Sequence, residues 1–176
     1  MALAGLPATG KSTLAKALGP ALDALVLDKD VLRAALFADR VDYSAEQNDL
    51  VIDIAYRTAA YLHRTLDRPT VIIDGRTFSE RHQVVTLKRA ASAMQTSLVI
   101  IECRCTPDTA RQRLSSDDGS HPAADRDFAL YLRRRASADP IEEPKLVLDT
   151  DRMDLRRCLA LSIEYARARL PGSAAS

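Results

Sequence analysis

The chain has 176 residues, a length typical of one domain with a substantial buried core. Its 25 Lys and Arg residues nearly balance its 24 Asp and Glu residues, and the net charge of +1 gives no overall attraction to nucleic acid or to an anionic membrane. No apolar run reaches the ~18 residues of a membrane span, and three cysteines without zinc-site spacing indicate reduced thiols. We therefore expect a cytoplasmic protein with no membrane partner.

The first pattern along the chain is the glycine-rich stretch GLPATGKST, which covers 5–13. It matches the phosphate-binding loop G-x-x-x-x-G-K-S/T at every position. Its two glycines allow the backbone N–H groups to approach phosphate oxygens. Lys11 offers a charge to the β- and γ-phosphates, and Ser12 offers a hydroxyl to Mg²⁺. We expect ATP and Mg²⁺ as cofactors, with nucleotide contacts from Gly5, Ala8, Thr9, Gly10, Lys11, Ser12 and Thr13.

After this loop, strands and helices alternate along the chain. The expected strands cover 2–4, 24–27, 70–74, 98–103 and 145–149. The expected helices cover about 11–18, 44–66, 79–94, 108–115, 125–136 and 154–170, and a further helix begins at 28–30. Gly19-Pro20 is expected to end the first helix, and Ser44 and Ser79 to cap later ones. Because no hairpin signal joins consecutive strands, we predict an α/β fold with a parallel sheet covered on both faces.

Charged residues follow the second expected strand, at the end where open parallel sheets bind ligands. Asp30 and Arg33 are three residues apart on one helical face, so they could present a proton-accepting carboxylate and an anion clamp to one substrate. Two alternatives stay open. Asp30 could instead cap the helix and form a surface ion pair, or Asp28, nearer to the strand end, could be the base.

Several segments together resemble the AAA-type predicted-kinase family of P-loop proteins, a group related to phage-type polynucleotide kinases, zeta toxins and chloramphenicol phosphotransferase. They are 5–13, Asp28-Lys29-Asp30-x-x-Arg33, Val71-Ile72-Ile73-Asp74 with Ser79-Glu80-Arg81, and 146–150. The resemblance implies a P-loop NTPase three-layer fold, with a five-stranded parallel sheet in the order 2-3-1-4-5, helices on both faces and a small mobile lid. It also implies ATP on the first loop, an acceptor hydroxyl near the ends of the second and third strands, and Asp30 as the general base.

The resemblance also implies a metal site. Ser12 would bind Mg²⁺ directly, and Asp74 would lie in the same site. There Asp74 would either hold a water on Mg²⁺ or orient Arg33 and the acceptor. A purely structural role for Asp74 is the alternative.

The match to the family fails at the lid arginine, which should neutralise charge on the transferring phosphate. Its position falls near Asp118, an acid. We expect Arg111 or Arg113 to replace it, with Arg126 next. Solvated helix charges would explain any one of these arginines equally well.

The sequence thus predicts an ATP- and Mg²⁺-dependent kinase that transfers the γ-phosphoryl group to a hydroxyl. Its expected catalytic residues are Lys11, Asp30, Arg33 and Arg113, with Arg111 as a further nucleotide contact. The acceptor is a small molecule or a nucleic-acid 5′ end, and the near-neutral charge and few aromatic residues favour the small molecule. A non-catalytic nucleotide-binding regulatory domain and a simple ATPase are the alternatives.

The predicted domain organisation is simple. One P-loop kinase-like domain covers 1–170, its lid covers about 111–136, and a disordered tail covers 171–176. Because only four residues precede Gly5, the first strand is short. This is also compatible with another domain fused to, or paired with, this one.

Overall fold

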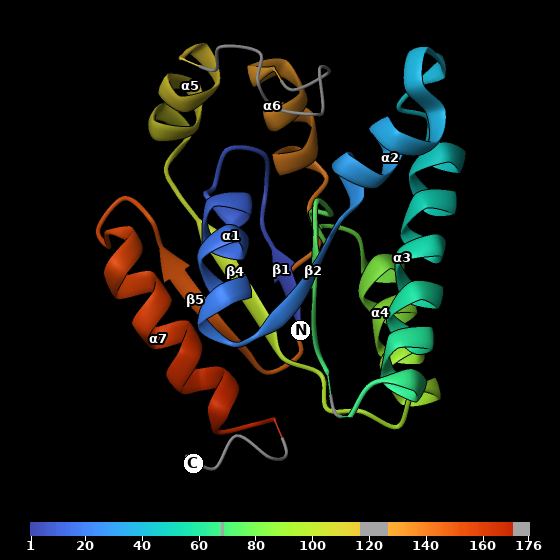
Figure 1. Ribbon diagram of the computed structural model, residues 1–176. Coiled ribbons are helices and arrows are strands. Elements are labelled where there is room, and N and C mark those ends of the chain that lie inside the picture. Colours follow the sequence, from blue (N-terminus) through green and yellow to red (C-terminus); the bar gives the residue numbers. More distant parts are fainter. Residues whose placement is uncertain (68, 117–126, 171–176) are drawn as a thin grey trace.

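The computed structural model describes residues 1–67, 69–116 and 127–170. Within these ranges five strands form one parallel sheet in the order β2-β3-β1-β4-β5, which confirms the predicted order (Figure 1). The strands are β1 (Ala2–Ala4), β2 (Ala24–Asp28), β3 (Thr70–Asp74), β4 (Ile100–Arg104) and β5 (Lys145–Asp149). The helices are α1 (Lys11–Ala21), α2 (Lys29–Phe37), the 3₁₀ turn η1 (Ala38–Arg40), α3 (Ala45–Thr65), α4 (Arg81–Ala93), α5 (Pro107–Ser115), α6 (Phe128–Ala136) and α7 (Leu155–Arg167).

Some predictions fall outside the described residues. The centre of the predicted lid, with Asp118 and Arg126, lies there, and so does the tail over 171–176. The lid boundaries at about 111–136 and the single domain over 1–170 therefore stay predictions.

The two faces of the sheet carry separate hydrophobic clusters, because alternate residues of a strand point to opposite sides. Ala2 and Ala4 lie in the cluster that α3 and α4 cover, whereas Leu3 lies in the cluster that α1 and α7 cover. All three side chains are fully buried. Figure 1 shows the same layers, with α1 and α7 on one side of the sheet and α3 and α4 on the other. The fold is therefore the three-layer α/β arrangement expected from the sequence.

The parallel strands bring several loops to one edge of the sheet. Asp28 and Asp74, the last residues of β2 and β3, are register neighbours there. The loop between β1 and α1 starts at the same edge, because β1 pairs in parallel with β3. In Figure 1, α2, α5 and α6 lie at this carboxyl end of the strands. The edge is the usual ligand-binding position of open parallel sheets.

The first helix is longer than predicted. Gly19-Pro20 does not end it, and α1 continues to Ala21. Pro20 lies in the last turn, where the N–H of Leu22 still donates to the carbonyl oxygen of Leu18 at 3.0 Å. The proline therefore removes one helical hydrogen bond without ending the helix.

The two predicted serine caps have different outcomes. Ser44 caps α3 as expected, because its Oγ accepts a hydrogen bond from the N–H of Gln47 at 3.0 Å. Ser79 does not cap α4, whose N-cap residue is Glu80. The Oγ of Ser79 instead shares a hydrogen bond of 2.8 Å with the hydroxyl of Thr77. The Ser79 hydroxyl thus pairs with Thr77 within the turn rather than with the first backbone N–H groups of α4.

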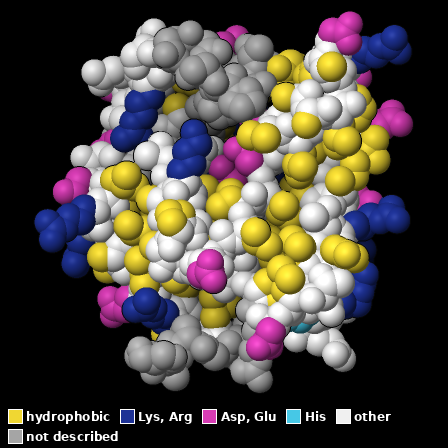
Figure 2. All heavy atoms as spheres, viewed as in Figure 1, with side chains coloured by type: hydrophobic (Ala, Val, Ile, Leu, Met, Phe, Trp, Pro, Cys, Tyr) yellow, Lys and Arg dark blue, Asp and Glu magenta, His cyan; other side chains and the backbone are white. Residues whose placement is uncertain are grey.

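The edge strand β2 is only partly covered. Leu25 and Val26 point to opposite faces and are 42% and 36% exposed. Figure 2 shows hydrophobic side chains gathered over β2, α2 and α3 on the face in view. Among the described helices, none is both long enough and apolar enough to cross a bilayer.

Candidate functional site

The loop between β1 and α1 has a backbone that requires glycine at its start. Gly5 has a φ of +134°, and a Cβ at this position would lie 2.3 Å from the carbonyl oxygen of Cys103. The N–H of Gly5 donates to the carbonyl oxygen of Thr77 at 2.9 Å. The loop is thus held between β4 and the segment after β3, and both space and conformation exclude a side chain at Gly5.

The N-terminus of α1 is arranged to receive an anion. Gly10 is its N-cap residue and provides no side-chain cap. Nζ of Lys11 donates to the carbonyl oxygen of Leu6 at 2.7 Å, and the hydroxyl of Thr9 donates to the same oxygen at 2.8 Å. Lys11 is consequently folded over the loop and only 9% exposed. A helix dipole, backbone N–H groups and an ammonium group converge here, as in polyphosphate sites.

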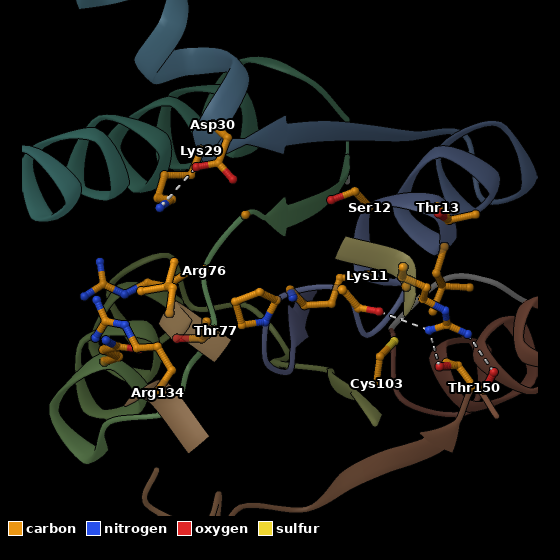
Figure 3. Close-up of a pocket in the computed structure, with 18 of the residues that line it drawn as sticks. Lys11, Ser12, Thr13, Lys29, Asp30, Arg76, Thr77, Cys103, Arg134 and Thr150 are labelled. Atoms are coloured by element: carbon orange, nitrogen blue, oxygen red, sulfur yellow. Dashed lines mark hydrogen bonds and ion pairs between the residues drawn. The ribbon is translucent and has the colours of Figure 1, made fainter. Parts of the chain in front are cut away.

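A cleft of about 1050 Å³ runs along the carboxyl ends of the strands. Figure 3 shows Ser12, Thr13 and Thr150 on one side of Lys11, and Arg76, Thr77 and Arg134 on the other. We call the first part the donor end, formed by residues 10–13 and Thr150. The second part is the acceptor end, formed by Lys29, Asp30, Arg33, Asn48 and Arg76. The volume is just above the ~300–1000 Å³ typical of a small-molecule pocket.

Asp30 faces the acceptor end. Of the three carboxylates that the sequence placed at this edge, Asp30 lines the cleft, whereas Asp28 and Asp74 do not. Oδ1 of Asp30 accepts a hydrogen bond from Nη1 of Arg33 at 2.9 Å. Asp30 is 8% exposed and Arg33 is 2% exposed. Their ion pair is therefore buried, unlike the solvated surface pair considered as an alternative.

Asn48, near the start of α3, holds the cations beside Asp30. Its Oδ1 accepts hydrogen bonds from Nζ of Lys29 at 2.8 Å and from Nη2 of Arg33. Its Nδ2 donates to the carbonyl oxygens of Tyr43 and Ser44 at 2.9 and 2.7 Å. The guanidinium of Arg33 also lies 4.9 Å from the centre of the Tyr43 ring. The network fixes the side chains of α2 against the start of α3.

Arg76 enters the acceptor end from the segment after β3. A close approach of this segment to α2 brings it there: Gly75 has a φ of +83°, and a Cβ at that position would lie 3.0 Å from the backbone nitrogen of Lys29. Nη2 of Arg76 donates to Oδ1 of Asp49 at 2.7 Å. Arg76 is 8% exposed, and its Nε and Nη1 have no hydrogen-bond partner among the described residues.

Asp28 and Asp74 form a pair of carboxylates beneath the cleft. Oδ1 of Asp28 caps α2 by accepting a hydrogen bond from the N–H of Asp30 at 2.8 Å. Burial first, and then the neighbouring charge of Asp74, raises the pKa of Asp28. Asp74 is 1% exposed, and neither of its carboxylate oxygens has a described partner. A buried carboxylate of this kind is normally satisfied by ordered water or a cation.

The two arginines of α5 lie in different surroundings. Nη1 of Arg113 donates to the carbonyl oxygen of Ala8 and to the hydroxyl of Thr150, each at 3.0 Å, and Nη2 donates to the carbonyl oxygen of Thr150 at 3.0 Å. Arg113 therefore joins α5 to the phosphate-binding loop and lines the cleft. Arg111 is exposed, and its guanidinium lies 4.2 Å from the centre of the Phe128 ring on α6. It does not line the cleft.

A sequence profile described as AAA domain matches residues 1–153. The chain belongs to this family. No curated protein sequence shows significant similarity to this AAA-domain protein.

Solved structures share the fold of this AAA-domain protein. One is a protein from Chloroflexus aurantiacus that is provisionally named a kinase. It has a TM-score of 0.72 and 22% identity, over 93% of this chain and 96% of that one. A gluconokinase from Sinorhizobium meliloti has a TM-score of 0.69 and 13% identity, over 95% and 91%. The APS kinase of Mycobacterium tuberculosis, solved with AMPPNP and APS, has a TM-score of 0.69 and 19% identity, over 94% and 95%. P-loop kinases are thus among the proteins with this fold.

The acceptor end contains residues that sequence reasoning missed. The sequence patterns select neither Asn48 nor Arg76, and they include Lys29 only as part of the segment from Asp28 to Arg33. The basic residue after a strand that ends in Asp74 was a usable signal for Arg76, because it places a cation at the ligand-binding edge. Asn48 gave no such signal, since it lies inside a helix.

Proposed function

We propose that this AAA-domain protein is a kinase that uses ATP and Mg²⁺ and transfers the γ-phosphoryl group to a hydroxyl of an acceptor. The observation that carries the proposal is that one cleft joins a phosphate-binding loop to the buried Asp30–Arg33 pair. A nucleotide sensor needs only the loop. Phosphoryl transfer also needs a carboxylate to accept the hydroxyl proton and a group that positions the acceptor.

At the donor end, the nucleotide would bind along the loop and the start of α1. Lys11 would contact the β- and γ-phosphates, and Ser12 would bind Mg²⁺, which neutralises charge on phosphate oxygens when it is bound. Asp74 lies beneath the cleft with both carboxylate oxygens unpartnered, so it would reach that ion only through a water. Mg²⁺ usually keeps several waters and phosphate ligands, so few protein ligands would be needed here. The other proposed nucleotide contacts are Gly5, Ala8, Thr9, Gly10 and Thr13.

At the acceptor end, Asp30 would accept the proton of the attacking hydroxyl. Its contacts with Arg33 and Lys29 both use Oδ1, which leaves Oδ2 for this proton. The hydroxyl oxygen forms a bond to the γ-phosphorus, the bond from that phosphorus to the β–γ bridging oxygen breaks, and ADP leaves with the electron pair. Arg33 would hold the acceptor in line for this attack.

Arg113 would act from the donor side. Its hydrogen bonds to Ala8 and Thr150 support a role in holding the loop in position for the nucleotide. A nucleotide contact from Arg111 stays a proposal and has less support, since the Arg111 guanidinium stacks on Phe128. If it contacts the nucleotide, it must leave that ring.

The test is phosphoryl transfer from ATP labelled at the γ-phosphate, with Mg²⁺ and a panel of hydroxyl acceptors. We expect a labelled product with wild-type protein and a fall of about 10²- to 10⁴-fold in kcat for Asp30→Asn, the usual effect of losing a general base. Binding of AMPPNP, measured by calorimetry, should be unchanged in Asp30→Asn. Asp53→Asn is the matched control, because Asp53 has a side chain that is 60% exposed on α3 and lies outside the cleft.

Other outcomes would separate the alternatives. AMPPNP binding without transfer to any acceptor and without ATP hydrolysis would indicate a regulatory nucleotide sensor. A full rate of transfer in Asp30→Asn would remove Asp30 from the mechanism and leave the proposed kinase without its base.

A further inference from the structure

Three cations gather on one wall of the acceptor end. Lys29 and Arg33 come from α2, and Arg76 comes from the segment after β3. The two arginines are 2% and 8% exposed, so their guanidinium groups are enclosed by protein. Surface arginines of a solvated helix face would not be buried in this way. The fold itself therefore holds these cations in place on the wall.

Carboxylates on the same wall do not fully balance these cations. Asp30 is buried with Arg33, but the carboxylate that pairs with Arg76 belongs to Asp49, whose side chain is 57% exposed. The pKa of Lys29 is lowered, first by burial, while Asp30 raises it and the charges of Arg33 and Arg76 lower it further. The cations thus lie close enough to repel one another, and an anion bound between them would relieve this repulsion.

Hydrogen-bond donors on this wall also lack partners. Nε and Nη1 of Arg76 and Nε of Arg33 are enclosed and have no partner among the described residues. Buried donors are normally satisfied, so unpartnered ones need an explanation such as an ordered water or an ion, and both arginines also line the cleft. A guanidinium binds two oxygens of one phosphate or carboxylate through a fork that includes Nη2, and Nη2 of Arg76 has two hydrogens, of which Asp49 accepts one.

The position of this wall connects it to the acceptor rather than to the nucleotide. In Figure 3, Arg76 lies on the side of Lys11 opposite to Ser12 and Thr13. Asp30, the proposed base, is on the same side as Arg76 and forms an ion pair with Lys29 at 3.2 Å. A group held by Arg76 would therefore belong to the molecule that carries the attacking hydroxyl.

We propose that Arg76, together with Arg33 and Lys29, binds an anionic group of the acceptor, and that the acceptor is a small hydroxyl compound carrying a phosphate or a carboxylate. The assignment of this wall to the acceptor rests on the kinase function proposed above. The enclosed arginines select one compact anion, whereas a nucleic-acid strand would meet several exposed cations along a groove. Arg76 is thus a specificity-determining residue that discriminates against neutral sugars and alcohols.

The binding test needs no turnover. Wild-type protein saturated with AMPPNP and Mg²⁺ is titrated with inorganic phosphate by calorimetry, so that the donor end is already filled. We expect phosphate to bind, and its affinity to fall at least about tenfold in Arg76→Gln, since one charge-assisted contact is lost. Arg81→Gln is the control: Arg81 has a side chain that is 66% exposed, is paired with Glu142 and lies outside the cleft, so its variant should bind phosphate like wild type.

A second variant, Asp49→Asn, should change the affinity for phosphate in the opposite direction. Asp49→Asn removes the carboxylate that occupies Nη2 of Arg76 at 2.7 Å. Phosphate affinity should then rise several-fold, a change that a purely structural role of the Arg76–Asp49 pair would not produce. Because the Asp49 side chain is half exposed, this variant should fold even if Arg76→Gln does not. Equal phosphate affinity in wild type and Asp49→Asn, or no phosphate binding to wild type, would overturn the proposal.

The substrate class is tested by transfer assays with matched acceptors: glycerol, glycerate and glycerol 3-phosphate, then glucose, gluconate and glucose 6-phosphate. We expect kcat/KM to be at least about 10²-fold higher for an anionic member than for its neutral counterpart. Arg76→Gln should remove most of this preference. The carboxylate and phosphate arms identify which anion is used.

The two proposals fail in different ways. Phosphate binding without transfer would contradict the kinase function and leave the anion site standing. Transfer to neutral acceptors with no loss in Arg76→Gln would contradict the anion site and leave the kinase standing. Transfer to a DNA or RNA 5′-hydroxyl alone, with a steep salt dependence of binding, would also overturn the small-anion proposal.

Discussion

The two ends of the cleft are built from different parts of the chain. The donor end is positioned mainly by backbone: the tight loop at Gly5 that leads into it, the uncapped start of α1 and the carbonyl oxygen of Leu6 that holds Lys11. The acceptor end is formed by side chains, with Arg33 and Arg76 held by polar partners from α3. Backbone geometry fixes the first, and contacts between elements fix the second.

This difference has a functional consequence. A backbone-built phosphate site tolerates few changes, because each N–H position depends on the φ and ψ angles of its neighbours. A side-chain site can change its ligand by one substitution without altering the sheet. We therefore infer that the donor end defines the protein as a nucleotide-binding protein and that the acceptor end defines the substrate. The following variants test this division, beginning with the largest expected effect.

Lys11→Ala should damage the donor end most. The ammonium group would neutralise charge that develops on the transferring phosphoryl group, and loss of one such donor commonly lowers kcat by about 10²- to 10³-fold. ADP release in a steady-state assay measures this effect. Lys16→Ala, on the exposed side of the same helix, should leave kcat unchanged. Similar losses in both variants would mean that the helix as a whole, not the Lys11 charge, was affected.

Gly5→Ala should destabilise the protein by about 3 kcal/mol or more, because a Cβ would meet the carbonyl oxygen of Cys103 at 2.3 Å in a backbone conformation that disfavours side chains. The free energy of unfolding in urea measures this change. Gly19→Ala is the comparison: Gly19 lies inside α1, and its new methyl would meet the movable side chain of Val26 at 3.1 Å. We expect a change below about 1 kcal/mol there, and an equal loss in both variants would contradict the backbone account.

Asn48→Ala should affect the acceptor end alone. It removes the oxygen that accepts hydrogen bonds from both Lys29 and Arg33. We expect KM for the acceptor to rise about tenfold, the equivalent of one lost hydrogen bond to a charged group, with KM for ATP unchanged. Gln112→Ala, at an exposed position on α5, is the control. A parallel rise in both KM values for Asn48→Ala would mean that the two ends are not independent.

Asp28→Asn should have the smallest effect, and one that depends on pH. Because burial and Asp74 raise the pKa of Asp28, the folded protein still holds this proton just above pH 3.8, where most unfolded chains have lost it. The free energy of unfolding therefore falls as pH rises through the folded pKa. Asn keeps the cap on α2 and removes the titration. Relative to wild type, the variant should gain stability as pH rises above 3.8, by under about 1 kcal/mol because the helix dipole favours the charged cap.

Urea unfolding at several pH values measures this difference. For Asp53→Asn, at an exposed position, the free energy of unfolding should change with pH as it does in wild type over the same range. A stability difference between wild type and Asp28→Asn that does not change with pH would contradict the buried-pair account.

The sequence predicts the fold and the position of the glycine-rich loop before α1 well, because the determining signals are local. Nine contiguous residues specify the loop, a β-branched run that ends in an acid specifies β3, and an apolar run that ends in an acid specifies β5. The acceptor end is less predictable, because Asn48 and Arg76 join Arg33 only when α2, α3 and the segment after β3 meet. The end of α1 was missed because a proline in the last helical turn costs too little to stop a helix that α7 and the sheet cover.

The most direct test of the account is a calorimetric titration of the protein with AMPPNP and Mg²⁺. We expect binding to one site per chain in the wild type, strongly weakened binding in Lys11→Ala, and unchanged binding in Arg76→Gln, because the first variant alters the donor end and the second alters the acceptor end. Absence of binding to wild type, or equal weakening in both variants, would contradict the division of the cleft on which the proposed function rests.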